Sequence, residues 1–252
     1  MDSVKEIKSA YDFAFYGAND ESVFVSPRVV VPIVCELFHP KSVIDVGCGT
    51  GVWLSVFMEN GVHRILGLDG LYVNPDWLKI PRDCFRSTDL AARFEVKERF
   101  DLAVCLEVAE HLPAQSADNL IKVLTTAAPV VLFSAAVPQQ GGTEHINEQW
   151  PEYWHRKFED YGFLKFDVIR KEIWLNPSVK YWYRQNTFVY TKKDLLVDDR
   201  LSDSNGYASD LMLLHREVFS AQFRLRPLLR RLPSAFQEFL LNQWSKIRRR
   251  AS

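Results

Sequence analysis

The sequence has few cysteines, and their spacing excludes the usual uses of clustered thiols. Cys35, Cys48, Cys84 and Cys105 lie far apart and form no CxxC pair. Neither a structural zinc site nor a disulfide framework is therefore indicated. We expect a reducing, cytoplasmic setting for this chain.

Long apolar runs are also absent. No stretch approaches the roughly 18 consecutive apolar residues of a membrane span, and the longest, VVLFSAAV at 130–137, has the length of a strand. The first residues, MDSVKEIKSAYDF, mix acids and bases and lack the apolar core of a secretory signal. There is no internal repeat and no low-complexity tract. With 47% hydrophobic and 25% charged residues, the composition is that of a globular protein without a transmembrane segment.

The chain has almost no net charge, but the charge is unevenly distributed. The formal total is -1, whereas residues 214–252 carry nine Lys or Arg against two Glu. A solvated helix, or one that makes a homodimer, is the favoured interpretation of this basic tail. Binding of RNA phosphates or an anionic surface is the alternative.

Strand-like and helix-like segments alternate through the middle of the chain, which predicts an α/β fold with a mostly parallel sheet. Strands are expected at 42–47, 64–70, 84–89, 100–108, 129–137, 163–171 and 186–193, and helices after 51, around 116–127 and near 150–160. One of the last strands should be antiparallel. The stretch NPSVKYWYRQ between the last two is expected to be a long aromatic loop.

The two ends of the chain have a different pattern from the middle. Residues 1–40 are expected to form helices punctuated by Pro27, Pro32 and Pro40, and to act as a lid segment. The region 41–193 would be the core domain, and 194–252 a helical C-terminal extension.

A glycine-rich turn follows the first expected strand. VIDVGCGTG places Gly47, Gly49 and Gly51 where a tight strand-to-helix turn needs unusual backbone angles and a ligand must reach the amides. A dinucleotide site would have its third glycine at 52, where valine stands. Asp45, two residues before the turn, would repel a pyrophosphate and suits a ligand with a positive centre.

VIDVGCGTG resembles motif I of the class I S-adenosylmethionine-dependent methyltransferases, and the order of later landmarks over about 40–190 resembles that family too. The resemblance implies a Rossmann-like seven-stranded sheet with helices on both faces, plus N- and C-terminal helical additions. It implies that Asp69, followed by Gly70, accepts hydrogen bonds from the ribose hydroxyls of S-adenosylmethionine, that Asp89 meets the adenine amine, and that Leu90 lies beside the ring. Leu106 and Glu107, at the end of the fourth strand, would also line the cofactor pocket.

The segment LEVAEHLP at 106–113 carries the chemistry-bearing side chains. Glu110 and His111 should lie beside the acceptor, because ligands bind beyond the carboxyl ends of the strands. His111 is the best general base by its pKa range. The E-x-x-E-H pattern also resembles ubiquinone-biosynthesis O-methyltransferases and small-RNA 2′-O-methyltransferases, in which such residues bind a metal. By that resemblance Glu107, Glu110, His111 and a later histidine, His145 in GGTEHINEQW, would hold Mg²⁺ or Mn²⁺.

Three roles for this segment remain open: metal binding, general-base catalysis by His111 or His145, and a structural role. We expect O-methylation of a small hydroxylated acceptor, a sugar or other secondary metabolite. The alternatives are a metal-dependent RNA 2′-O-methyltransferase and a non-catalytic module that keeps the cofactor fold.

Overall fold

The structure, a computed structural model, describes residues 21–195, in which helices and strands alternate. The main elements are α3 (Ser22–Phe38), β1 (Ser42–Val46), α4 (Val52–Glu59), β2 (Arg64–Asp69), β3 (Phe85–Ser87), β4 (Leu102–Leu106), α5 (Ala117–Ala127), β5 (Val130–Ser134), α6 (Pro151–Glu159), β6 (Phe163–Phe166), α7 (Val168–Ile173), α8 (Tyr181–Asn186) and β7 (Phe188–Lys192). Short 3₁₀ turns join several of them, including Ala109–His111 after β4.

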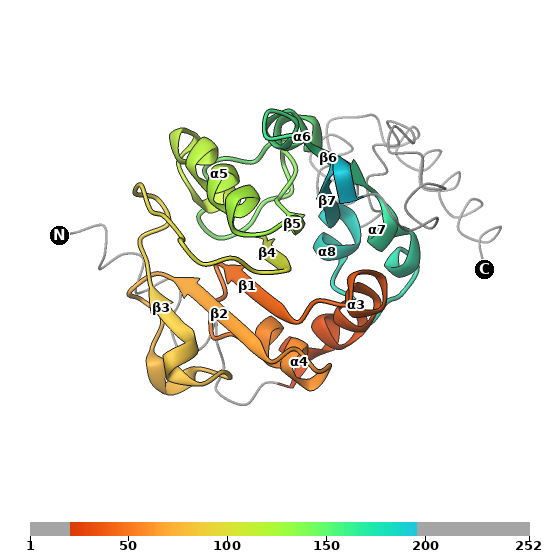
Figure 1. Cartoon of the computed structure of the whole chain (residues 1–252). Coiled ribbons are helices and arrows are strands. Elements are labelled where there is room, and N and C mark those ends of the chain that lie inside the picture. Colours follow the sequence, from red (N-terminus) through yellow and green to blue (C-terminus); the bar gives the residue numbers. More distant parts are fainter. Residues whose placement is uncertain (1–20, 196–252) are drawn as a thin grey trace, which may run out of the picture. The chain divides into compact units, whose positions relative to one another are not determined.

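The strands form one seven-stranded sheet in the order β3-β2-β1-β4-β5-β7-β6 (Figure 1). All pairs are parallel except those of β7, which runs antiparallel to both β5 and β6. The predicted Rossmann-like seven-stranded sheet with one antiparallel strand is therefore confirmed. Because β1, β2, β4 and β5 are parallel, their carboxyl ends meet at one edge, which is where such sheets bind ligands.

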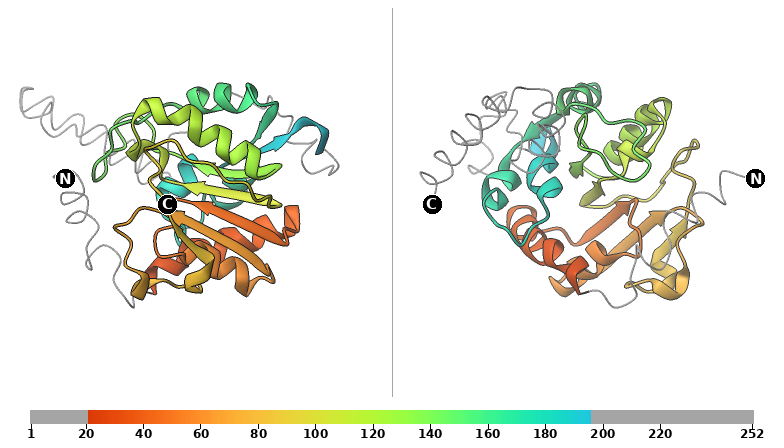
Figure 2. Two further views of the ribbon diagram at one scale, coloured as in Figure 1. Left: turned by 60° about the vertical axis from the view of Figure 1, so that its left-hand side comes forward. Right: turned by 180° about the vertical axis from the view of Figure 1, so that it is seen from behind.

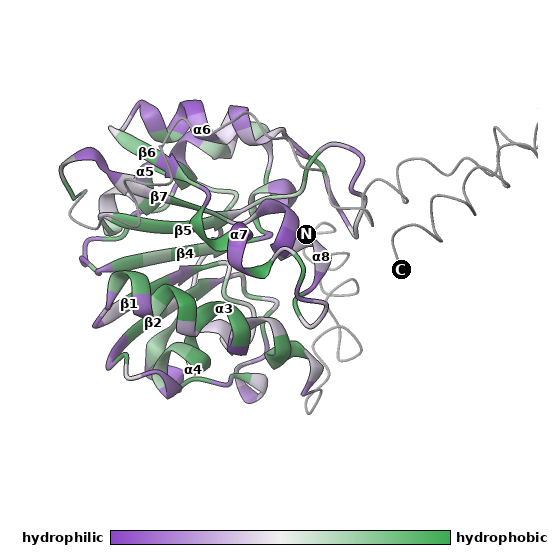
Figure 3. Ribbon diagram, turned by 90° about the vertical axis from the view of Figure 1, so that its right-hand side faces the viewer, coloured by the Kyte–Doolittle hydropathy of each residue, from purple (hydrophilic) through white to green (hydrophobic). Residues whose placement is uncertain are grey.

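Helices cover both faces of this sheet, as expected (Figure 2). Alternate residues of each strand face opposite sides: Val104 packs with α3, α4 and α7, and Cys105 packs with α5 and α6. The central strands are hydrophobic along their length, while the outer surface of α6 is hydrophilic (Figure 3). The sheet is therefore the centre of two cores, which is typical of parallel sheets buried on both faces.

Two prolines lie inside α3, where the sequence predicted them to punctuate the helices. Pro27 and Pro32 each remove one backbone donor, yet the helix continues from Ser22 to Phe38. Val30, Val31 and Val34 are fully buried against the sheet side of the helix. We attribute the continuity of α3 to this burial, which offsets the missing hydrogen bonds. Residues 22–38 thus pack with the core residues of the sheet.

Two expectations for the stretch 163–186 were wrong. The strand expected over 163–171 ends at Phe166, and Val168–Ile173 forms α7, because Ile169 and Ile173 lie one helical turn apart and are both fully buried. The expected aromatic loop contains the helix α8. Both helices are short, with six residues each, so tertiary packing stabilises them rather than intrinsic propensity.

Among the described residues no helix is both long enough and apolar enough to span a membrane. Residues 1–20 of the predicted lid segment and residues 196–252, which include the basic tail, lie outside the described part of the chain. The predicted domain boundaries therefore stay a prediction.

Candidate active site

The glycine turn connects the end of β1 to the start of α4. Gly47, Gly49 and Gly51 all have positive φ angles, of 86°, 54° and 82°. A Cβ atom on Gly47 would also lie 2.3 Å from Cγ2 of Val108, a distance that no real contact allows. Glycine is thus required at this position for two reasons, the backbone angle and the close approach of the turn after β4.

Asp69, the last residue of β2, holds this turn in place. Its Oδ2 accepts a hydrogen bond from the Gly49 amide at 2.6 Å, and its Oδ1 accepts one from the Gly70 amide at 2.6 Å. The hydroxyl of Tyr72 also donates to Oδ1. Burial raises the pKa of Asp69, while the hydroxyl and the two amides act to lower it. The carboxylate predicted to bind the ribose is therefore tied to the glycine turn and to a tyrosine.

Asp45 lies one strand away, next to Gly67 of β2 in the sheet register. Its side chain is 2% exposed, and its Oδ2 has no hydrogen-bond partner among the described residues. Burial raises its pKa well above the ordinary value, and the nearby charge of Asp69 raises it further. A cationic group bound beside these two carboxylates would relieve both effects.

The other predicted cofactor residues lie in different surroundings. Asp89 is exposed, and its Oδ1 accepts hydrogen bonds from the backbone amides of Ala91 and Ala92 at 3.0 and 3.3 Å, as in a capped turn. Leu90 and Leu106 are buried in the two hydrophobic cores, one on each side of the sheet. Each of these residues already has a packing or capping role.

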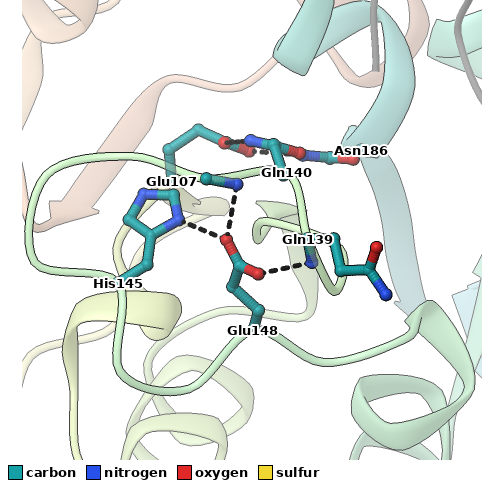
Figure 4. A network of polar contacts seen from close by, with 7 residues as sticks. Glu107, Gln139, Gln140, His145, Glu148 and Asn186 are labelled. Carbon is teal, nitrogen blue, oxygen red and sulfur yellow. Dashed lines mark hydrogen bonds and ion pairs between the residues drawn. The ribbon is translucent and has the colours of Figure 1, made fainter. Parts of the chain in front are cut away.

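Glu107 follows β4 with a positive φ of 55°. Its amide donates to the carbonyl of Ser134 at 3.0 Å and to the Ser134 hydroxyl at 3.1 Å. Its carboxylate accepts one hydrogen bond from Nε2 of Gln140 and one from Nδ2 of Asn186, both at 3.1 Å (Figure 4). Asn186 also donates to Oε1 of Gln140 at 2.9 Å. These three side chains form a closed polar network that joins β4, the loop after β5 and the end of α8.

Glu110 lies in the 3₁₀ turn after β4 and is fully buried. Neither of its carboxyl oxygens makes a hydrogen bond of ordinary geometry with the described residues. Burial raises its pKa well above the usual value, and the charge of Glu107 raises it further. The backbone carbonyl of Glu110 accepts hydrogen bonds from the amides of Ile146 and Asn147, both at 2.9 Å. The turn after β4 is therefore fastened to the loop that precedes α6.

That fastening brings His111 and His145 together. Their rings are T-shaped, with centroids 4.8 Å apart and planes at 86°. One ligand atom from each of Glu110, His111 and His145 lies within 4.8 Å of the others. Burial lowers the pKa of His111 to about 4, and the nearby His145 lowers it too. Three of the four predicted metal ligands thus converge, whereas the fourth, Glu107, is held in the amide network.

Sequence reasoning missed the residues that complete this site. Gln140 and Asn186 are buried polar residues with no local motif, and only the pairing of β7 with β5 brings them to Glu107. Tyr72, three residues after Asp69, was also missed. Tyr183 of α8, by contrast, belongs to the aromatic stretch that the sequence singled out; burial raises its pKa to about 12, and its ring packs edge-on against Trp53 at 5.1 Å. The one available hint was the position of Asn186, a polar residue next to a segment with strong β signals.

Comparisons with known proteins bear on the family and the fold. A family model described as a methyltransferase domain matches residues 27–169, more than half of the chain. No curated protein matches the sequence.

Several solved structures share the fold. The sugar N-methyltransferase KedS8 from a Streptoalloteichus species is 13% identical with a TM-score of 0.55, over 72% of this chain and 92% of that one. The methyltransferase domain of bacterial CtHen1-C is 21% identical with a TM-score of 0.50, over 67% and 97%. DesVI of Streptomyces venezuelae is 11% identical with a TM-score of 0.50, over 66% and 92%. At such identities the likeness concerns the fold alone.

Proposed function

Because the chain belongs to the methyltransferase domain family, we propose that this S-adenosylmethionine-dependent methyltransferase methylates an oxygen of a small hydroxylated acceptor, such as a sugar or another secondary metabolite. The observation that carries the proposal is the convergence of Glu110, His111 and His145 beyond the end of β4. This is the edge of the sheet at which such folds bind their ligands.

The glycine turn and its acids provide the cofactor half of the site. S-Adenosylmethionine supplies an activated methyl group on a cationic sulfur, so the protein mainly has to bind and align the reactants. The three glycines let the backbone of the turn approach a ligand closely, and Asp69 holds the turn through the Gly49 amide. Asp45 offers a buried carboxyl whose raised pKa marks a place that favours positive charge. Asp69, with its two oxygens, suits the ribose hydroxyls.

An oxygen acceptor is supported by the acid–base properties of the cluster. A hydroxyl has a high pKa and reacts well only when its proton is removed or a cation lowers that pKa. His111, with a pKa of about 4, is neutral near pH 7 and is a weak proton acceptor. A neutral imidazole is, however, the form that binds metals. The cluster therefore fits a divalent cation better than a histidine base acting alone.

Glu110 supports the same conclusion independently. The oxygens of this buried carboxyl make no hydrogen bond of ordinary geometry, and the carboxylate of Glu107 lies close by, so that a cation bound there would relieve the repulsion between them. Glu110, His111 and His145 offer one oxygen and two nitrogen ligands, of which the carboxylate suits both Mn²⁺ and Mg²⁺ and the two imidazoles favour the transition metal Mn²⁺. A divalent cation there would lower the pKa of an acceptor hydroxyl.

The test combines cation binding with identification of the methylated atom. Mn²⁺ and Mg²⁺ are titrated by calorimetry into protein saturated with S-adenosylhomocysteine, using Glu110→Gln and, as a matched control, Glu95→Gln at an exposed site. Binding should be lost only in Glu110→Gln. The protein is then incubated with ¹³C-methyl-labelled cofactor and a panel of glycosides and amino sugars.

Label on a hydroxyl oxygen of a glycoside, dependent on Mn²⁺, is the expected result. Label found only on nitrogen would overturn the proposal for oxygen. Equal cation binding by the wild-type protein and Glu110→Gln would overturn the assignment of the cluster. Failure of the wild-type protein to bind S-adenosylhomocysteine would contradict the cofactor half of the site.

A further inference from the structure

The loop between β5 and α6 is closed by one carboxylate. Glu148 accepts hydrogen bonds from the backbone amides of Gln139 at 2.6 Å and Gly141 at 2.8 Å, and its Oε1 lies 2.9 Å from Nδ1 of His145 (Figure 4). The side chains of Glu148 and His145 are only 18% and 12% exposed. Three donors from one loop therefore converge on a single, mostly buried acceptor.

This arrangement determines which nitrogen of His145 carries the proton. An ionised carboxylate only accepts hydrogen bonds, and two backbone N–H groups already donate to this one. Nδ1 of His145 must therefore be the donor to Glu148. In the neutral ring, the lone pair is then on Nε2, the nitrogen left available for a ligand or a proton.

The position of the ring is restricted as well as its protonation. A Cβ atom at Gly142 would lie 2.2 Å from Nε2 of His145, so the ring rests directly on that glycine. On another side, it meets His111 edge to face. Beyond His145, the amides of Ile146 and Asn147 fasten the loop to Glu110. A rotated His145 ring would lose the bond to Glu148 and the fit over Gly142 together.

The same carboxylate acts on the other side of the site. Gln139 and Gly141, whose amides it binds, flank Gln140, the residue that donates to Glu107. The backbone around Gln140 is thus held by Glu148, while its side chain is held by Glu107 and Asn186. Glu148 therefore connects the network of Glu107, Gln140 and Asn186 to the cluster that contains His145.

We propose that Glu148 is a positioning residue: its carboxylate fixes His145 as the Nδ1–H tautomer and presents Nε2 to the site formed with Glu110 and His111. The inference rests on the proposed function, which makes that site the place of methyl transfer. General experience with metal-binding histidines agrees, since their second nitrogen usually donates to a carboxylate or carbonyl group.

A glutamine at this position separates positioning from simple loop closure. Its single carbonyl oxygen cannot replace two carboxylate oxygens that serve three donors. If the amide nitrogen of the new glutamine faces the backbone N–H of Gln139, two donors face each other and that hydrogen bond is lost. If it faces His145 instead, it donates to Nδ1 and moves the ring proton to Nε2. The first arrangement loses the bond to Gln139 but keeps an acceptor oxygen facing His145, and only the second changes the bond that sets the tautomer. The side chain keeps nearly the same shape in both.

The experiment reads the tautomer directly, without an acceptor. Long-range ¹H–¹⁵N NMR spectra are recorded at pH 8 on the full-length protein labelled with ¹⁵N-histidine, and His145 is assigned among the six histidines with His145→Gln. The variants are Glu148→Gln, Glu148→Ala and the control Glu152→Gln, four residues away on α6. Calorimetric binding of S-adenosylhomocysteine to each variant reports on folding and on the cofactor half of the site.

We expect a pure Nδ1–H pattern for His145 in the wild-type protein and in Glu152→Gln, an Nε2–H or mixed pattern in Glu148→Ala, and a smaller change in Glu148→Gln. An Nε2–H ring in the wild-type protein would overturn the proposal, and so would an unchanged pattern in Glu148→Ala. The wild-type spectrum alone therefore tests the inference even if a variant does not fold. If the wild-type protein shows the Nδ1–H pattern but does not bind S-adenosylhomocysteine, the proposed function is contradicted and the role of Glu148 is not.

Discussion

Glu110→Met should stabilise the folded protein while abolishing its cation site. The side chain of Glu110 is fully buried, its carboxyl oxygens make no hydrogen bond of ordinary geometry within residues 21–195, and the carboxylate of Glu107 lies close by. An unpaired buried polar group costs about 1–3 kcal/mol, and its replacement by an apolar group of similar shape removes that cost. We expect a gain of this size in the free energy of unfolding in the presence of EDTA.

The gain should also depend on pH, in a direction set by the raised pKa of Glu110. A carboxyl whose pKa is higher in the folded state keeps its proton where the unfolded chain has released its own. The wild-type protein therefore loses stability as the pH rises above the unfolded pKa of about 4.5. The advantage of Glu110→Met should grow with pH, with a slope of at most about 1.4 kcal/mol per pH unit.

Urea unfolding followed by tryptophan fluorescence at several pH values between 4 and 8 measures this difference. Glu95→Met, at an exposed position, is the control and should change stability by less than about 0.5 kcal/mol. Adding Mn²⁺ should then stabilise the wild-type protein and the control but not Glu110→Met. The reasoning would be refuted by a less stable Glu110→Met protein in EDTA, because Glu110 would then have a hydrogen-bonded role in the folded state.

Three further substitutions probe the glycine turn, a histidine of the cluster and the amide network around Glu107. Gly47→Ala places a side chain at a positive φ and against Val108, so it should cost about 2–4 kcal/mol of stability and weaken binding of S-adenosylhomocysteine. The control Gly61→Ala, where a Cβ atom meets nothing, should leave that binding unchanged. Calorimetry measures stability and binding for each variant. His111→Asn should make stability less sensitive to acid. Because the pKa of His111 is about 4 in the folded protein and 6.5 ordinarily, the unfolded chain takes up the proton first as the pH falls. In urea titrations from pH 6.5 to pH 4, the wild-type protein should lose at most about 3 kcal/mol of stability relative to the variant. Asn186→Ala removes one of two amide donors from the buried carboxylate after β4 and should lower the urea midpoint by an amount equivalent to about 1–3 kcal/mol.

Periodicity and glycine spacing predicted the sheet because both are local signals. The buried strands read as short apolar runs, and the turn at Gly47 needs backbone angles that glycine supplies. The failures were α7 and α8, six residues each, whose helical form depends on packing against the sheet. Segments this short carry too few turns for a helical period to stand out from a strand.

The candidate site was predictable only where its residues are neighbours in the sequence. Glu107, Glu110 and His111 are neighbours in LEVAEHLP, but only Glu110 and His111 join the cluster with His145, whereas the carboxylate of Glu107 accepts hydrogen bonds from two amide side chains. Its actual partners, Gln140 and Asn186, lie 33 and 79 residues further along the chain. Such pairings follow from strand order and register, which a single sequence does not contain.

The hydroxyl of Tyr72 occupies an oxygen of Asp69, the residue predicted to bind the ribose. It donates to the same oxygen of Asp69 that accepts from Gly70, and its ring lies where a Cβ atom at Gly70 would be. A ribose hydroxyl arriving at Asp69 would exchange one hydroxyl donor for another, so the number of hydrogen bonds would not change. The hydrogen bonds of Asp69 would then contribute little net affinity for the nucleoside, and removing the competing hydroxyl with Tyr72→Phe should tighten its binding.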